Sequence, residues 1–541
     1  MPTRIAAAVA YVTMALAAVS PAAAQDGVDA LFAPWASRAS PGCAVAAARD
    51  GRTLFARAYG QAELERDVPI TPETVFEAGS VSKQFTAAAI LLLVANGKIS
   101  LADDVRRYVP ELPDYGTRIT IDHLLGHRGG LREWEHVAAI AGWTPVSFGD
   151  FLGITARQRS LNFRPGEQFQ YGGAGYVLAA LVVERTSGQS LAEFSRARIF
   201  EPLGMNATRW RIAADTAIQG RAIAYQKQGG GYVQSMPASH VYGHGGLHTT
   251  VGDLLRWNEA LAHARLGRFV SAELYREGRL RDGRATGYGR GVFVGTYRDS
   301  PEVFHDGGYG GYRAWLGRYP DAGLSVALLC NTPVGNVTAL GRRVVDGLLP
   351  ERESGKTGGT TPRPAAPAAA SLPAGEAERY AGVFLSDELG LPLFLAADSG
   401  RLDAEGSIAQ RVAPGRFRVP WAEIIFDTPD VVRLIKSGSD HQTLRRVAGP
   451  LPSGEELAAL AGRYTSDEAN ATYLAAIEGG KLVLRLERRP AHLYTLTPIG
   501  RDVFRSGGTI VRFHRDARGA VRWLAFSLQR IRELRFARIS P

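Results

Sequence analysis

The chain has 541 residues, of which 45% are apolar and 21% are charged, and this balance is ordinary for a folded globular protein. Its length exceeds what one compact core fills and predicts about three or four domains. The formal net charge is +10, with much of the excess near the C-terminus. Aromatic residues are not interleaved with these basic ones as in a nucleic-acid groove, so we interpret the charge as a solvated surface and expect no nucleic-acid partner.

The first 24 residues have the order of a secretory signal peptide. Arg4 precedes a short apolar run, small residues follow at positions 21–24, and Gln25 begins a more polar sequence. The pattern predicts cleavage after Ala24 and export to the periplasm or the medium. A membrane anchor is the alternative, but the run is short for a span of about 20 residues. No later segment is long and apolar enough to cross a bilayer, so we expect no membrane span after cleavage.

Residues 25–350 alternate strand-like and helical patterns. A hairpin is predicted at the turn residues 50–52, between two strand-like runs. A helix is predicted over about 80–96, where an alanine- and leucine-rich stretch has strong helix propensity and a broad apolar face. Three later strand-like runs are separated by turn residues and predict an antiparallel meander. These runs are 302–307, 312–319 and 324–331.

Two cysteines, Cys43 and Cys330, lie in apolar runs that are typical of buried strands. Two isolated cysteines do not make a zinc site by themselves. We interpret them as buried free thiols, although the sequence leaves open whether they form a disulfide in an oxidising compartment.

Residues 351–374 are rich in proline, alanine, glycine and threonine and lack apolar periodicity, which predicts a linker. Beyond it, one short motif occurs at 381–388 and again at 461–468, and short alternating strand patterns follow each copy. Such a repeat favours small antiparallel barrels or sandwiches. We expect two β modules, at 375–452 and 453–541, with a single barrel shared by both copies as the alternative.

The strongest chemical signal is a serine and a lysine three residues apart, Ser80 and Lys83, at the start of the predicted helix. A serine hydroxyl is a poor nucleophile until a nearby base takes its proton. Residues three apart on a helix share a face, so Lys83 can reach the Ser80 hydroxyl. The N-terminus of the helix also favours negative charge and supplies a backbone donor for an oxyanion. We therefore predict Ser80 as the nucleophile and Lys83 as its activating partner.

The sequence around these residues is similar to the serine β-lactamase-like and penicillin-binding-protein superfamily, in the branch of class C β-lactamases, D,D-peptidases, esterases and D-aminopeptidases. Six blocks carry the similarity, in the family's order, between about residues 30 and 350. They are 74–90, 99–113, 121–131, 163–176, 199–208 and 243–254. The resemblance implies an α+β fold in which a five-stranded antiparallel sheet is flanked by helices and lies beside an all-helical half. The small antiparallel β-barrel or sandwich modules would follow this domain.

The family's Tyr-x-Asn motif falls on Tyr171, Gly172 and Gly173. Tyr171 keeps the phenol that such enzymes use to accept and return protons, and Lys83 favours its ionised form. Gly173 stands where the family has an asparagine. This loss weakens an interpretation as a β-lactamase more than one as a general hydrolase.

The family's Lys-Thr-Gly strand falls on His305, Asp306 and Gly307, as in the branch that resembles D-aminopeptidases and some esterases. On a strand His305 and Gly307 point to the same face, so His305 is expected to line the cleft. Gly307 would let the substrate approach the backbone, and Gly308 N–H would join Ser80 N–H as the second oxyanion donor. When protonated, His305 would offer a positive partner to a substrate carboxylate, and otherwise a neutral donor. A purely structural strand histidine is the alternative.

Other histidines are weaker candidates. Three histidines, His240, His244 and His248, recur every four residues, which on a helix would suggest a metal site. Their glycine-rich surroundings fit the family's Gly-Gly-Leu turn better than a helix. His123 and His127 are interpreted as structural. We expect no metal or organic cofactor, and the absence of a G-x-S-x-G elbow disfavours an α/β-hydrolase.

Together these residues predict an exported serine hydrolase that cleaves an ester or amide bond through an acyl-enzyme on Ser80. The architecture favours a D-aminopeptidase or peptidase, closely followed by an esterase, while β-lactamase activity is less favoured. A penicillin-binding or degenerate non-catalytic scaffold is the contrasting hypothesis. The expected partner is a small-molecule or peptide substrate. Cell-envelope material is a second candidate partner, because the basic β modules would favour an anionic surface.

Overall fold

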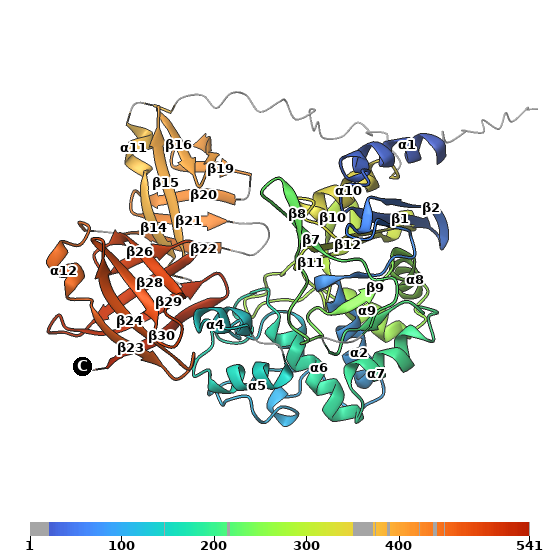
Figure 1. Cartoon of the computed structure of the whole chain (residues 1–541), viewed down its shortest axis with the longest axis horizontal. Coiled ribbons are helices and arrows are strands. Elements are labelled where there is room, and N and C mark those ends of the chain that lie inside the picture. The colour runs from blue at the N-terminus through green and yellow to red at the C-terminus, as the bar shows by residue number, and fades with distance from the viewer. Residues whose placement is uncertain are drawn as a thin grey trace, which may run out of the picture.

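The computed structural model describes residues 21–144, 147–213, 217–349, 372–373, 375–386, 390–420, 422–435, 441–447 and 449–539. It shows an α+β domain followed by two β modules (Figure 1). The first 20 residues of the predicted signal peptide, and nearly all of the predicted linker 351–374, lie outside the described residues. In the part of the chain that is described, no helix combines the length and the apolar character that a bilayer span requires.

A six-stranded antiparallel sheet, ordered β10-β11-β12-β13-β1-β2, forms the centre of the first domain. Its strands are β1 (Cys43–Arg49), β2 (Arg52–Tyr59), β10 (Phe293–Tyr297), β11 (Ser300–Tyr309), β12 (Tyr312–Tyr319) and β13 (Leu324–Cys330). The predicted hairpin and the predicted meander are both confirmed, as β1–β2 and β11–β12–β13. The sheet has one strand more than the five expected, because β10 adds to its edge beside β11.

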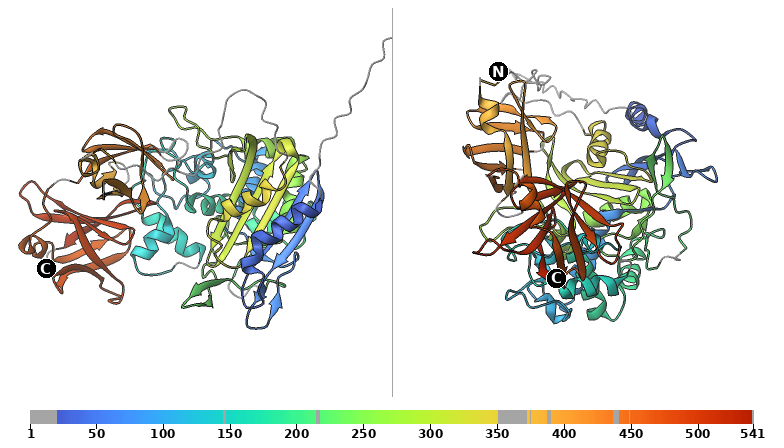
Figure 2. Two further views of the ribbon diagram at one scale, coloured as in Figure 1. Left: turned by 90° about the horizontal axis from the view of Figure 1, so that it is seen from above. Right: turned by 60° about the vertical axis from the view of Figure 1, so that its left-hand side comes forward.

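Helices cover both faces of this sheet. On one face α1 and α10 pack over an apolar layer that includes Phe32, Trp315 and Val344 (Figure 2, left). On the other face α2 and α8 lead into the helical half of the domain, whose core is continuous with that of the sheet. The helices are α1 (Pro21–Phe32), α2 (Lys83–Ala95), α3 (Ile121–Leu125), α4 (Trp134–Ile140), α5 (Phe148–Arg157), α6 (Ala174–Ser187), α7 (Leu191–Ser195), α8 (Val251–Ala262), α9 (Arg268–Tyr275) and α10 (Val337–Asp346).

Short elements complete this domain and set the position of its loops. The 3-10 turns are η1 (Ala33–Trp35), η2 (Gly79–Ser82), η3 (Val105–Arg107) and η5 (Pro320–Ala322), and η4 (Arg196–Phe200) is a π-helical turn. The small strands are β3 (Gln61–Glu63), β4 (Val68–Pro69), β5 (Phe76–Glu77), β6 (Arg209–Trp210), β7 (Tyr225–Gln228), β8 (Gly231–Gln234) and β9 (Leu247–Thr249). The helix expected from Ser80 therefore begins as a 3-10 turn, and its α-helical part starts at Lys83.

The two cysteines form a disulfide. Cys43 on β1 lies directly opposite Cys330 on β13, and both side chains are fully buried. The interpretation as free thiols is therefore wrong, because it considered each strand by itself. The pairing register of the two strands brings the sulfur atoms together.

The two copies of the repeated motif begin two separate sheets, each after a short helix, α11 (Glu376–Tyr380) or α12 (Gly454–Ala458). The first sheet has nine strands and its own core. They are β14 (Gly382–Ser386), β15 (Pro392–Asp398), β16 (Arg401–Ala404), β17 (Ser407–Ile408), β18 (Gln410–Ala413), β19 (Arg416–Val419), β20 (Ala422–Thr428), β21 (Val431–Ile435) and β22 (His441–Arg446). Its two edge strands, β17 and β18, are consecutive in the chain, with only Ala409 between them, but they do not pair with each other.

The second sheet is a closed barrel of eight strands. They are β23 (Gly462–Ser466), β24 (Ala471–Glu478), β25 (Lys481–Leu486), β26 (Leu493–Gly500), β27 (Val503–Ser506), β28 (Thr509–Arg515), β29 (Val521–Leu528) and β30 (Ile531–Ile539). In both modules an arginine of the last strand donates to the backbone just before the first strand: Arg446 to Ala381 O and Arg538 to Ala461 O. The sequence repeat thus corresponds to a repeated structural unit.

The barrel packs against the helical half of the first domain, next to α4 (Figure 1). Tyr473 donates a hydrogen bond to Ile140 O, and Arg488 donates to Ala141 O over 2.7 Å. Apolar side chains of the barrel, such as Tyr464, belong to the same buried cluster as those of α4. The barrel is therefore docked through a core and not merely tethered.

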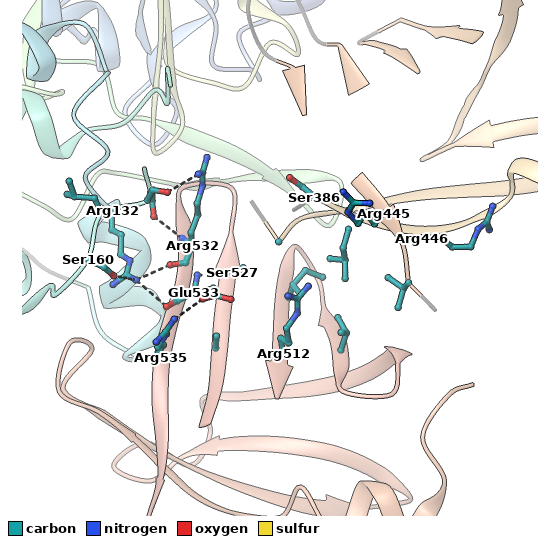
Figure 3. Close-up of a pocket in the computed structure, with 18 residues that line it drawn as sticks. Arg132, Ser160, Ser386, Arg445, Arg446, Arg512, Ser527, Arg532, Glu533 and Arg535 are labelled. Atoms are coloured by element: carbon teal, nitrogen blue, oxygen red, sulfur yellow. Dashed lines mark hydrogen bonds and ion pairs between the residues drawn. The ribbon is translucent and has the colours of Figure 1, made fainter. Parts of the chain in front are cut away.

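The β29–β30 hairpin provides a second contact. Arg132, whose side chain is 3% exposed, donates to Glu468 over 2.6 Å and to the carbonyl oxygens of Arg532 and Glu533 over 3.0 and 3.1 Å. Figure 3 shows Arg132 reaching this hairpin at the wall of a cavity of about 650 Å³. Both β modules and the first domain line this cavity, so it marks the junction of the three units.

Candidate active site

The predicted nucleophile lies in the 3-10 turn that precedes the buried helix α2. Ser80 is half-buried, and 3.0 Å separates its Oγ from Lys83 Nζ. Lys83 Nζ also donates to His244 O over 2.7 Å, and its side chain is almost wholly buried. Burial lowers the pKa of Lys83 to about 7, against an opposing effect of Glu133. A neutral lysine is therefore accessible near neutral pH and lies where it can accept the Ser80 proton.

Tyr171 lies over the same pair of residues, from the loop that precedes α6. Its ring centroid is 4.9 Å from Lys83 Nζ, and its hydroxyl oxygen is buried. Among the described residues this oxygen makes no hydrogen bond of good geometry. Burial raises the pKa of Tyr171, whereas the nearby Ser80 hydroxyl lowers it. The structure thus brings Ser80, Lys83 and Tyr171 together as the sequence predicted.

Two other groups occupy the place of the missing asparagine side chain. A Cβ atom on Gly173 would lie 3.0 Å from His244 Cδ2 and 3.2 Å from Glu133 Oε1. The backbone N–H of Gly173 donates to Glu133 Oε2 over 2.6 Å. The buried Glu133 carboxylate therefore occupies part of the space that the asparagine side chain would fill.

The strand β11 forms the other wall of the site. A Cβ atom on Gly307 would lie 2.1 Å from Ala78 O and 3.0 Å from Ser80 N, so only glycine lets the strand approach the nucleophile turn this closely. A Cβ atom on Gly79 would lie 2.7 Å from Gly308 N. The backbone N–H groups of Ser80 and Gly308 are consequently neighbours, as a pair of oxyanion donors must be.

His305 lies next to the site, and its burial favours the neutral one of the two forms that the sequence left open. Its side chain is fully buried, with Nε2 3.0 Å from Tyr288 Oη and Nδ1 2.5 Å from Asp306 O. Burial and the nearby Lys83 lower the pKa of His305 to about 3, so the ring is neutral at physiological pH. It does not offer a positive charge to a substrate. Its ring centroid lies 5.8 Å from that of Tyr171, so the His305 ring packs beside the Tyr171 ring.

The remaining histidines have other places in the fold. His248 lies on β9, and His244 contributes its backbone carbonyl to Lys83. His123 closes a capping box at the start of α3, and His127 Nδ1 accepts from Gly172 N over 3.3 Å. Among the residues that the structure describes, no group of three or more histidine, cysteine, aspartate or glutamate side chains is arranged to hold a metal ion.

Sequence reasoning missed two charged residues of this region, Glu133 and Arg530. Glu133 lies two residues after the similar block 121–131, and an acidic residue beside such a block was the available signal. Arg530 lies at the tip of the β29–β30 hairpin, and its guanidinium carbon is 5.3 Å from the Tyr171 ring centroid. The sequence contains no signal for Arg530, because only the docking of the barrel brings it here.

A serine with a buried lysine, a tyrosine above them and two backbone donors beside a glycine strand define the class of serine acyl-transfer hydrolases with a β-lactamase-like fold. The family model described as Beta-lactamase matches residues 27–349. The chain therefore belongs to the Beta-lactamase family.

Similar proteins fall in the branch that the sequence indicated. The chain is 26% identical to a D-aminopeptidase of Brucella anthropi over 530 residues, 93% of this chain and 96% of that protein. It is 31% identical to penicillin-binding protein 4* of Bacillus subtilis (strain 168) over 315 residues, 53% of this chain and 67% of that protein. The structure of an octameric penicillin-binding protein homologue from Pyrococcus abyssi superposes with a TM-score of 0.56 at 23% identity, covering 79% of this chain and all of that one. The protein is a serine hydrolase of this family and is related to D-aminopeptidase.

Proposed function

We propose that this protein is an exported D-aminopeptidase, which releases a D-amino acid from the amino end of a peptide or amide through an acyl-enzyme on Ser80. The observation that carries the proposal is Glu133. Its side chain is 2% exposed, and its Oε1 has no hydrogen-bond partner among the described residues. A buried, unpaired carboxylate oxygen is costly unless a ligand satisfies it, and an ammonium group is its natural partner.

The space beside Glu133 suits such a group. A cavity of about 30 Å³ is lined by Glu133, Tyr171 and Gly172, and it is large enough for one group of the size of water or ammonium. Tyr171, which lines this cavity, also lies 4.9 Å from Lys83 Nζ and so connects the cavity with the nucleophile. The relation to a D-aminopeptidase over 93% of the chain supports this choice of substrate.

The reaction then proceeds in two steps. Neutral Lys83 takes the proton of Ser80 as the Oγ attacks the carbonyl carbon, and the oxyanion accepts from Ser80 N–H and Gly308 N–H. Lys83 and Tyr171 return a proton to the leaving amine. A water molecule, deprotonated by the same groups, hydrolyses the ester on Ser80 and regenerates the enzyme.

The free edge of β11 fits a peptide substrate. β10 pairs with β11 only from Ser300 to Phe304, and in the described part of the chain no strand pairs with the outer edge of the following segment up to Tyr309. An extended substrate backbone can add to this edge next to Ser80.

The proposal of export rests on two features. The first residues have the order of a signal peptide. The buried Cys43–Cys330 disulfide is of the kind that persists in oxidising compartments such as the periplasm and the medium.

The test compares the protein with Ser80→Ala on D-alanine p-nitroanilide, a short-chain p-nitrophenyl ester and a chromogenic cephalosporin. We expect turnover of the anilide that disappears in the variant. Turnover of the ester alone would make the protein an esterase. Slow acylation by the cephalosporin without turnover would favour a penicillin-binding protein. The similarity to the Bacillus subtilis protein is the reason to test this alternative.

A second pair of variants tests the ammonium site. We expect Glu133→Gln to raise KM for the anilide at least tenfold and to leave KM for the ester unchanged, because the ester has no ammonium group. Glu135→Gln is the matched control, since Glu135 also lies near the site but is 35% exposed and already faces His244 and Tyr309. A larger effect of the control would place the ammonium at Glu135.

A further inference from the structure

The cavity at the junction of the three units is rich in arginine. Its volume of about 650 Å³ is in the range of sites that hold small organic ligands. The first domain, the first β module and the barrel each contribute at least one arginine to it. Among the described residues its charged lining consists of one glutamate, Glu533, and six arginines, which are Arg132, Arg445, Arg446, Arg512, Arg532 and Arg535.

Two of these arginines are neutralised from outside the cavity. Arg132 pairs with Glu468 over 2.6 Å, and Arg446 pairs with Asp430 over 2.7 Å. Both also donate to backbone carbonyl oxygens, so they hold the chain segments around the cavity in place. Their roles are structural, and four of the lining arginines remain.

The four remaining arginines outnumber the acids that the lining and its neighbours in the chain provide. The one lining carboxylate, that of Glu533, lies 3.2 Å from Arg535. Asp387 and Glu388 follow the lining residue Ser386 in the sequence. Even when all three acids are counted, three negative charges stand against four positive ones. The junction therefore keeps an excess of positive charge.

Arg512 is the arginine whose charge is not matched. Among the described residues its guanidinium makes no ion pair and no hydrogen bond. It lies on β28, and its cross-strand neighbours Val503 and Ala525 also line the cavity. Ala525 pairs in turn with Arg535, so a small side chain stands between two arginines whose backbones are two strand spacings, or about 10 Å, apart. Figure 3 shows both arginines on the barrel, with Arg445 of the first module across from Arg512.

We propose that the junction cavity binds a small molecule with several negatively charged oxygen atoms, and that Arg512 and Arg535 recognise it. A guanidinium donates paired hydrogen bonds in the geometry that phosphate and carboxylate oxygens accept. The like charges of the arginines repel one another, and a bound anion removes this repulsion. A ligand that contacts both β modules also strengthens their docking, because it binds only the assembled junction. The inference does not rest on the proposed function, since neither arginine belongs to the active site.

Isothermal titration calorimetry of the full chain with tripolyphosphate and, separately, with citrate tests this inference. The variants are Arg512→Gln, Arg512→Lys and Arg535→Gln, and Arg522→Gln is the matched control. Arg522 is on β29 of the same barrel, is 69% exposed, pairs with Asp516 and does not line the cavity. We expect one binding site in the parent, and a Kd that is about tenfold higher or more in each glutamine variant of the cavity. Arg512→Lys and Arg522→Gln should stay within a few-fold of the parent Kd.

The two probes identify the chemistry of the ligand, because tighter binding of tripolyphosphate indicates phosphate groups and tighter binding of citrate indicates carboxylates. No binding of either probe to the parent, or an equal loss in Arg512→Gln and Arg522→Gln, would overturn the proposal. Thermal unfolding without a probe separates binding from a structural role. Arg512 has no partner to lose among the described residues, so the midpoint of Arg512→Gln should not fall below that of the parent. A lower midpoint, or failure of this variant to fold, would show a structural role and would also overturn the proposal.

Discussion

A methyl group added at Gly307 would stand between β11 and the turn that carries Ser80. It would lie 2.1 Å from Ala78 O, a separation that non-bonded carbon and oxygen atoms do not tolerate. The strand and the turn must then move apart by about 1 Å, and Gly308 N–H moves away from Ser80 N–H. A misplacement of about 1 Å costs about 100-fold in rate, or about 2.7 kcal/mol in activation free energy. We expect this loss in kcat for Gly307→Ala.

The matched control is the next residue. A Cβ atom on Gly308 meets only the flexible side chain of Arg313, at 3.5 Å or more, and the substitution keeps the N–H that binds the oxyanion. We therefore expect Gly308→Ala to retain activity within a few-fold. The assay measures kcat on the substrate that the parent turns over, with thermal unfolding to verify that each variant is folded. Full activity in Gly307→Ala, or an equal loss in both variants, would refute the close approach of strand and turn.

Three further outcomes are expected. Because burial lowers the pKa of Lys83 to about 7, its proton-accepting form increases with pH, and kcat/KM should rise through about pH 7; a rate that is flat from about pH 5 to 9 would argue against Lys83 as the base. Replacing Cys43 and Cys330 together by alanine opens a disulfide with a sequence separation of 287 residues and should cost up to about 5 kcal/mol in denaturant unfolding, whereas an unchanged midpoint would contradict it. Arg132→Ala removes the guanidinium partner of the half-buried Glu468 carboxylate, which keeps only Arg159 N–H among the described residues, and should destabilise the docked barrel by up to about 3 kcal/mol, seen as faster proteolysis of the barrel; an unchanged cleavage rate would count against this contact.

The local part of the site could be predicted from the sequence. Ser80 and Lys83 are three residues apart at a helix start, so their contact depends on one turn of backbone. Gly307 follows from strand alternation and from the order of the similar blocks. The placement of these residues could be predicted because each depends on a single element and its neighbours in the chain.

What the sequence did not contain is decided by packing. The neutral, buried state of His305 depends on Tyr288, which comes from a different loop. The Cys43–Cys330 disulfide depends on the pairing register between β1 and β13, which are the first and last strands of the sheet along the chain and neighbours within it. Arg530 reaches Glu133 only because a separate barrel docks there. Such contacts join distant segments, and residue patterns along one segment carry no information about them.

The disulfide joins the first and the last strand of the six-stranded sheet, and so it closes the chain from Cys43 to Cys330 into a covalent ring. A single protease cut in the exposed turn between β7 and β8, at Gly229 or Gly230, opens this ring but releases no fragment. The two pieces would separate on a gel only after reduction. New chain ends could be placed at this turn for the same reason, because the two sides of the break remain linked through the middle of the sheet.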